Sequence, residues 1–275
     1  MSTHNPQIDS DKLDLKVLSN KKNQKIKSVV VTAYDYPSAK QFSLTSVDAL
    51  LVGDSVAMTV HGFKDTTHAT LEMMCVHTAA VSRGAANKLI ITDMPFLTCH
   101  RGPHYAVECA GALVRAGAHA VKVEGALGVE GSIEAIVRAG IPVMGHLGLT
   151  PQSYLQMGGY KVQGREVSAA NKIIDQANDL QQLGIFSLVL ECVPVALAQE
   201  ISGCLKIPVI GIGAGPHTDG QVLVYHDLLG LIPNAPALKF TRRYLPGSEL
   251  IQNAIEKFCQ DVRGSDFPSE NEVFV

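Results

Sequence analysis

The stretch HYAVECAGALVRAGAHAVKVEGALGVEGSIEAIVRAGIPVMGH, residues 104–146, contains the pattern that decides the fold. VRAGA at 114–118 and VRAGI at 137–141 each end a helical pattern on glycine, and an apolar run follows each of them. Glycine commonly closes a helix because it adopts the left-handed backbone conformation easily. The same junction, repeated after about 23 residues, therefore predicts successive βα units of a parallel sheet.

Outward from this stretch, the chain alternates between apolar runs and helical patterns. Eight runs are predicted strands: 28–33, 48–52, 88–93, 119–124, 141–146, 187–191, 207–212 and 237–240. The clearest helical patterns cover 71–85, 104–117, 132–140 and 168–184. Most of the strand runs are apolar on both faces, as strands covered by helices should be. We predict an α/β fold, a closed (βα)8 TIM barrel.

No break in composition and no linker divides the chain of 275 residues, so we expect a single domain over 1–275. Residues 1–27 are predicted to form an N-terminal helical extension that caps the barrel floor. Residues 264–275 are predicted to be a polar tail.

Composition excludes several classes of function. Lys and Arg total 23 against 26 for Asp and Glu, and Trp is absent, which argues against nucleic-acid binding. No apolar run is long enough for a membrane span, and no signal peptide is evident, so we expect a cytoplasmic protein without a membrane partner. The six cysteines form no CxxC pair and therefore indicate neither a zinc knuckle nor a disulfide scaffold. Small molecules and other subunits are the expected partners.

Polar residues gather at the predicted carboxyl ends of the strands, where (βα)8 barrels place their reactive groups. These residues are Asp54, Ser55, Asp93, Lys122, Glu124, His146 and Glu191. Several carboxylates on one rim would repel each other unless a cation compensates them, and oxygen ligands favour Mg²⁺. The alternative for Asp54 and Asp93 is that they cap the following helices.

Three further side chains have competing interpretations. Lys122 could form a Schiff base, hold a substrate oxyanion, or make a structural salt bridge with Glu124, and a neighbouring metal favours the second. Glu191 suits a general base, against a helix-capping role. His146 could be an acid, a base or a hydrogen-bond donor, although a single His at a strand end is more often a packed residue. The loops at 145–153 and 158–166 are typical of a lid or ligand grip.

Longer motifs resemble the ketopantoate hydroxymethyltransferase family. They are TAYDYPSA (32–39), LLVGDSVAMTVHG (50–62), HTAAVSRG (77–84), ITDMPF (91–96), VKVEG (121–125), GHLGLTPQS (145–153), GGYKVQGR (158–165), LECVP (190–194) and GIGAGPHTDGQVLVYHDLLG (211–230). The resemblance covers most of the chain. It departs from the family pattern at 66–70, around Cys75 and at 98–100, away from the proposed ligands.

The resemblance implies a (βα)8 barrel, Mg²⁺, and transfer of a hydroxymethyl group from 5,10-methylenetetrahydrofolate to 3-methyl-2-oxobutanoate, giving 2-dehydropantoate in pantothenate biosynthesis. It also implies a homodecamer. Asp54 and Asp93 then resemble direct metal ligands, with Glu124 a ligand through water. Lys122 with Asp54, Ser55 and Asp93 resembles the keto-acid site, and Glu191 the proton acceptor that forms a Mg-stabilised enolate.

Two alternatives stay open. The first is a Mg-dependent 2-oxo acid lyase or mutase of the phosphoenolpyruvate mutase and isocitrate lyase type, which usually carries a cysteine-bearing loop. Cys99 lies near the end of the third predicted strand but lacks that motif. The second is a catalytically silent barrel, against which the complete set of costly polar groups argues.

Overall fold

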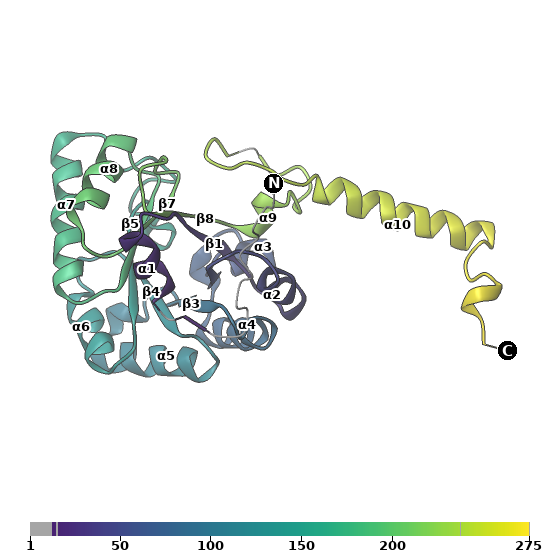
Figure 1. The fold of residues 1–275 in the computed structure, drawn as a ribbon, viewed down its shortest axis with the longest axis horizontal. Coiled ribbons are helices and arrows are strands. Elements are labelled where there is room, and N and C mark those ends of the chain that lie inside the picture. Colours follow the sequence, from purple (N-terminus) through teal and green to yellow (C-terminus); the bar gives the residue numbers. More distant parts are fainter. Residues whose placement is uncertain (1–12, 15, 237, 275) are drawn as a thin grey trace, which may run out of the picture. The chain divides into compact units, whose positions relative to one another are not determined.

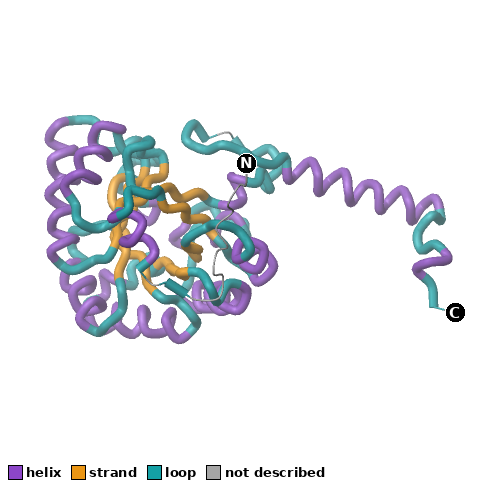
Figure 2. Tube along the Cα trace, viewed as in Figure 1, coloured by secondary structure: helices purple, strands orange, loops and turns teal. Residues whose placement is uncertain are grey.

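A computed structural model describes residues 13, 14, 16–236 and 238–274. Eight parallel strands close into a barrel in the order of the sequence, each hydrogen-bonded to the next and β8 to β1. Figures 1 and 2 show the strands inside a ring of helices. The strands are β1 (Ser28–Thr32), β2 (Ala49–Val52), β3 (Leu89–Asp93), β4 (Ala120–Glu124), β5 (Val143–Gly148), β6 (Ser187–Glu191), β7 (Val209–Ile212) and β8 (Gly220–Leu223). The predicted (βα)8 barrel is confirmed.

The first helix precedes β1, and the others in the barrel unit lie between consecutive strands from β1 to β7. They are α1 (Val17–Asn23), α2 (Tyr36–Ser43), α3 (Val56–Thr59), α4 (Leu71–Gly84), α5 (Pro103–Arg115), α6 (Glu130–Arg138), α7 (Val167–Gln182) and α8 (Val195–Cys204), with short 3₁₀ turns η1 (Thr66–His68), η2 (Cys99–Arg101) and η3 (Pro151–Ser153). Local sequence explains their starts: Asp35 and Thr70 cap α2 and α4 with side-chain oxygens, and Pro103 opens α5. The four predicted helices are found within a few residues of their expected bounds.

The predicted eighth strand at 237–240 is wrong. Residues 238–240 form coil and turn, and the barrel is closed instead by GQVL at Gly220–Leu223. This segment pairs with β7 on one side and with β1 on the other. Ser28 N donates to Asp219 O, and the β1–β8 register begins with Ser28 opposite Gly220. A strand with only four residues, one of them glycine and one glutamine, has little of the apolar signal by which the other seven are recognised.

The barrel interior is filled by side chains that point inward from alternate positions of the strands. Leu18 of α1 belongs to this core cluster and is 1% exposed. Helix α1 therefore packs against the core at the end of the barrel where the strands begin. The expected extension over 1–27 stays a prediction. The predicted extension before residue 13 lies outside the described residues.

The described chain divides into two compact units, one that contains the barrel and ends at Val224 and one that begins at Tyr225. This second unit contains α9 (Tyr225–Leu228), α10 (Gly247–Gly264) and the 3₁₀ turn η4 (Glu270–Glu272). One face of α10 carries exposed apolar side chains at helical spacing, namely Ile251, Ile255, Phe258 and Val262. The single domain expected over 1–275, with its polar tail at 264–275, stays a prediction. Among the described residues, no helix has the length and apolarity that crossing a bilayer requires.

Candidate active site

Strand register brings the polar residues into adjacent positions at the carboxyl end of the barrel. In the β3–β4 pair Asp93 is the partner of Lys122, and in the β4–β5 pair Glu124 is the partner of His146. Lys122 and Glu124 are two residues apart on β4, so both side chains point to the same face. The result is one buried polar cup.

Asp54, Asp93 and Lys122 make the first half of the cup. All three are nearly fully buried, and Asp54 N donates to Asp93 Oδ2 over 3.0 Å. Lys122 Nζ lies 3.1 Å from Asp93 Oδ1 and 3.6 Å from Glu124 Oε1. Asp93 Oδ1 is buried and makes no hydrogen bond within the described part of the chain. It forms an ion pair with Lys122.

His146 lies between Glu124 and Glu191. Its Nδ1 is 3.2 Å from both Glu124 Oε1 and Lys122 Nζ, and its Nε2 is 3.3 Å from Glu191 Oε2. The contact with Glu191 falls within ion-pair distance without hydrogen-bond geometry. His146 is 2% exposed, and it joins the cup to the glutamate expected to act as a base.

Backbone geometry fixes the position of Glu191 at the end of β6. Leu149 N donates to Glu191 O over 2.8 Å, and Gly148 stands beside it with φ of +92°. A Cβ on Gly148 would lie 2.2 Å from Glu191 O, so only glycine allows the two strands to approach this closely. The HLG sequence at the end of β5 thus sets where the Glu191 backbone lies.

The Ser55 side chain contacts a buried tyrosine that the sequence did not single out. Tyr34 follows β1, is fully buried, and its hydroxyl is 2.7 Å from Ser55 Oγ. Ser55 in turn precedes the short helix α3, whose first turn follows Asp54. Tyr34 lies within the TAYDYPSA motif, which was the available signal.

The β5–α7 loop adds a second residue that the sequence analysis missed, Gln152 in η3. Its backbone N–H donates to Glu124 Oε2 over 2.9 Å. Its side-chain Nε2 donates to Asp54 Oδ2 over 2.8 Å and to Met94 O over 3.0 Å. The loop predicted to be a lid therefore touches the cup, and GHLGLTPQS was the motif that contained the signal.

Burial and charge shift the pKa values in this cup. Burial, with the charges of Asp93 and Glu124, raises the pKa of Asp54 well above its usual range. Burial alone would raise the pKa of Glu124, but the charge of Lys122 and the contacts with His146 outweigh burial and lower it. For His146, burial and Lys122 lower the pKa, whereas Glu124 and Glu191 raise it, and the net pKa lies above the usual value.

A hard divalent cation fits this cup. Carboxylates outnumber cationic side chains, and the buried Asp93 Oδ1 has no hydrogen-bond donor among the described residues. Across those same residues, no group of three or more His, Cys, Asp or Glu side chains is arranged to hold a metal ion by itself. Mg²⁺ commonly binds through one or two carboxylates and keeps several waters, so an Asp pair suits it better than it suits zinc.

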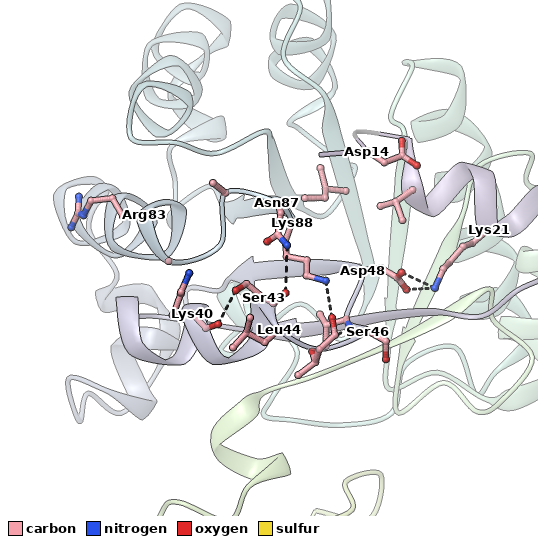
Figure 3. Close-up of a pocket in the computed structure, with 16 residues that line it drawn as sticks. Asp14, Lys21, Lys40, Ser43, Leu44, Ser46, Asp48, Arg83, Asn87 and Lys88 are labelled. Atoms are coloured by element: carbon pink, nitrogen blue, oxygen red, sulfur yellow. Dashed lines mark hydrogen bonds and ion pairs between the residues drawn. The ribbon is translucent and has the colours of Figure 1, made fainter. Parts of the chain in front are cut away.

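A cavity of about 1000 Å³ opens at the other end of the barrel, where β2 and β3 begin (Figure 3). Some of its charged groups make internal contacts: Lys21 pairs with Asp48 at 2.6 Å, and Lys88 Nζ donates to Thr45 O over 2.8 Å. None of the predicted site residues lines it. Because catalysis in (βα)8 barrels occurs at the carboxyl ends of the strands, we assign the active site to the cup.

The closed barrel and the acidic cup at its C-terminal face define the class: a (βα)8-barrel enzyme that works on a small molecule at the ends of its strands. The chain belongs to the ketopantoate hydroxymethyltransferase family, whose model matches residues 12–270.

Relatives extend over nearly the whole chain. A 3-methyl-2-oxobutanoate hydroxymethyltransferase of Caldicellulosiruptor saccharolyticus is 45% identical over 94% of this chain and 98% of its own. The Legionella pneumophila (strain Lens) protein of the same name is 48% identical over 92% and 97%. These relatives make the chain a hydroxymethyltransferase.

Solved structures show likeness in fold alone. A 2,3-dimethylmalate lyase, a member of the PEP mutase/isocitrate lyase superfamily, superposes with a TM-score of 0.61 at 18% identity, covering 95% of this chain and 91% of its own. Phosphonopyruvate hydrolase gives a TM-score of 0.64 at 11% identity over 94% and 93%. At such identities the likeness to the lyase and the hydrolase shows a shared barrel fold alone. The family match favours the transferase over the lyase and mutase alternative.

Proposed function

We propose that this enzyme transfers a hydroxymethyl group from 5,10-methylenetetrahydrofolate to 3-methyl-2-oxobutanoate, giving 2-dehydropantoate, as a step of pantothenate biosynthesis. The observation that carries the proposal is the position of Glu191 beside the acidic cup, 3.3 Å from His146. A keto acid held at the cup would present its branched carbon to a carboxylate at the neighbouring strand end.

The cup would hold Mg²⁺ through Asp54 and Asp93, with Glu124 acting through a water. The ion would supply a positive charge that stabilises the negative charge developing on the keto oxygen. The support comes from the excess of buried carboxylates and from Asp93 Oδ1, which accepts no hydrogen bond among the described residues and pairs with Lys122 at 3.1 Å. The neighbouring carboxylates raise the pKa of Asp54, and a bound cation would relieve that repulsion.

Lys122, Ser55, Asp54 and Asp93 would form the keto-acid site. Burial alone would lower the pKa of Lys122. The negative charges of Asp93, Glu124 and Asp54 outweigh burial, so the net pKa lies above the usual value. A lysine that stays protonated can hold a carboxylate or an enolate oxygen, whereas a Schiff base would need a neutral amine. The Ser55 backbone N–H would be a second donor to that oxygen.

Glu191 would remove the proton from the branched carbon of the keto acid. Water would release the one-carbon unit of 5,10-methylenetetrahydrofolate as formaldehyde, which breaks its two C–N bonds and leaves tetrahydrofolate. The electron pair of the C–H bond would form the enolate, which attacks the formaldehyde carbon. The new C–C bond leaves an alkoxide that takes up a proton and becomes the hydroxymethyl group. His146, between Glu124 and Glu191, would hold both carboxylates in place.

The experiment is to mix the enzyme with 3-methyl-2-oxobutanoate, 5,10-methylenetetrahydrofolate and Mg²⁺ and to follow the products by NMR. We expect a new hydroxymethyl signal that requires all three components. Consumption of the keto acid by C–C cleavage without folate would instead favour the lyase alternative.

We also propose a homo-oligomer, the homodecamer that the resemblance implies. The exposed apolar face of α10, with Ile251, Ile255 and Phe258, supports a contact with another copy. Sedimentation of the purified protein measures the number of subunits. The expected cytoplasmic location stays a prediction.

A further inference from the structure

Each carboxylate of the Asp54–Asp93 pair uses one oxygen for support within the protein. Asp93 Oδ2 accepts from Asp54 N, and Asp54 Oδ2 accepts from Gln152 Nε2. Within the described chain, Asp93 Oδ1 accepts no hydrogen bond, and the Lys122 ammonium lies 3.1 Å away. Because the Oδ2 atoms take these hydrogen bonds, the Oδ1 atoms are the ones left to a cation.

Glu124 is used differently. Its Oε2 accepts from Gln152 N over 2.9 Å, and its Oε1 faces His146 and Lys122. Both oxygens have protein partners, which fits a carboxylate that reaches a cation through water rather than directly. Gln152 therefore contacts two of the three carboxylates, Asp54 and Glu124.

Tyr154, two residues after Gln152, connects the same turn to another loop. Tyr154 hydroxyl donates to Asp65 Oδ2 over 3.0 Å, and the Tyr154 ring stacks on Tyr160 at a centroid distance of 5.5 Å. Asp65 belongs to the loop after α3 and also caps η1. Tyr154 thus holds the turn closed without touching any carboxylate of the cup.

We propose that Gln152 is a positioning residue of the cation site. Its side-chain amide holds the Asp54 carboxylate through Oδ2 and thereby leaves Oδ1 to the cation. The inference rests on the proposed Mg²⁺ site. Residues that orient metal ligands from outside typically change metal affinity by about 10- to 100-fold when they are replaced.

The test is a Mn²⁺ titration without keto acid or folate, in which free Mn²⁺ is measured by electron paramagnetic resonance. Gln152→Met keeps the side-chain length and the backbone N–H but removes the donor to Asp54. We expect its Kd for Mn²⁺ to rise about tenfold or more, with an unchanged unfolding temperature. Because Gln152 is only half-buried, the variant is expected to fold.

Tyr154→Phe is the matched control, since it removes the hydrogen bond from this turn to Asp65 and leaves the Gln152 side chain unchanged. We expect its Mn²⁺ affinity to equal that of the wild type. Unchanged affinity in Gln152→Met would overturn the inference, and so would equal weakening in both variants, because then the seating of the turn matters and the amide does not. A wild-type protein that binds no Mn²⁺ would overturn this inference and the proposed cation site together.

Discussion

His146 Nε2 lies 3.3 Å from Glu191 Oε2, while Nδ1 of the same ring lies 3.2 Å from Glu124 Oε1. One imidazole thus bridges the buried polar cup and Glu191. Burial and Lys122 lower the pKa of His146, but Glu124 and Glu191 outweigh them and raise it above its usual value.

This relationship predicts a pH dependence of stability. The folded-state pKa of His146 is raised, so its contribution to the free energy of unfolding is complete below the unfolded-state pKa, about 6.5, and is lost as pH rises through the higher folded-state value. The stability difference between wild type and His146→Gln should therefore shrink as pH rises. Urea titrations over a pH series measure it. A difference that grows with pH would contradict the assignment.

Magnesium should stabilise the folded protein. A ligand that binds only the folded state, at a hundredfold excess over its Kd, adds about 2.7 kcal/mol to the free energy of unfolding. Asp93→Asn removes a proposed direct ligand from the cup and should abolish this effect. Thermal unfolding with and without Mg²⁺ measures both proteins. A Mg²⁺ response in Asp93→Asn as large as in the wild type would place the cation elsewhere.

Gly148→Ala should destabilise the protein strongly and disturb Glu191. A left-handed backbone in a residue other than glycine costs about 1–3 kcal/mol, and here the new Cβ would also lie 2.2 Å from Glu191 O. Gly159→Ala is the matched control, because Gly159 has φ of +105° but nothing within 4 Å of a new Cβ. Chemical denaturation should show the larger loss for Gly148→Ala. Equal losses would mean that the contact with Glu191 O is relieved easily.

The Cys99 thiol should resist alkylation at moderately alkaline pH. Burial raises its pKa to about 12, so at pH 8 roughly one thiol in ten thousand is the reactive thiolate. Cys204 is exposed and provides the internal comparison. Peptide mapping after iodoacetamide treatment should find Cys204 labelled and Cys99 intact. Equal labelling of the two would show that the Cys99 thiol is accessible and that its pKa is not raised.

Much of the cup follows from the sequence, because it depends on regular structure. Lys122 and Glu124 share a face through the period of a strand, and the closed barrel places Asp93 beside Lys122 and Glu124 beside His146. These contacts need only the strand assignment and the order of the barrel.

The remaining features depend on irregular backbone. Gln152 reaches Asp54 from a turn whose path no periodicity specifies, and Tyr34 reaches Ser55 from the residues after β1. The last strand was misplaced because four residues with one glycine leave almost no hydrophobic signal, whereas its pairing with β1 is evident only in three dimensions.

The central claim is that Glu191 removes the C3 proton of 3-methyl-2-oxobutanoate. It is tested most directly by following loss of that proton in D₂O by NMR, with Mg²⁺ and without folate, in wild type and in Glu191→Gln. We predict Mg²⁺-dependent exchange in the wild type and none in the variant, while the variant still binds Mn²⁺. Exchange at the wild-type rate in Glu191→Gln would contradict the account.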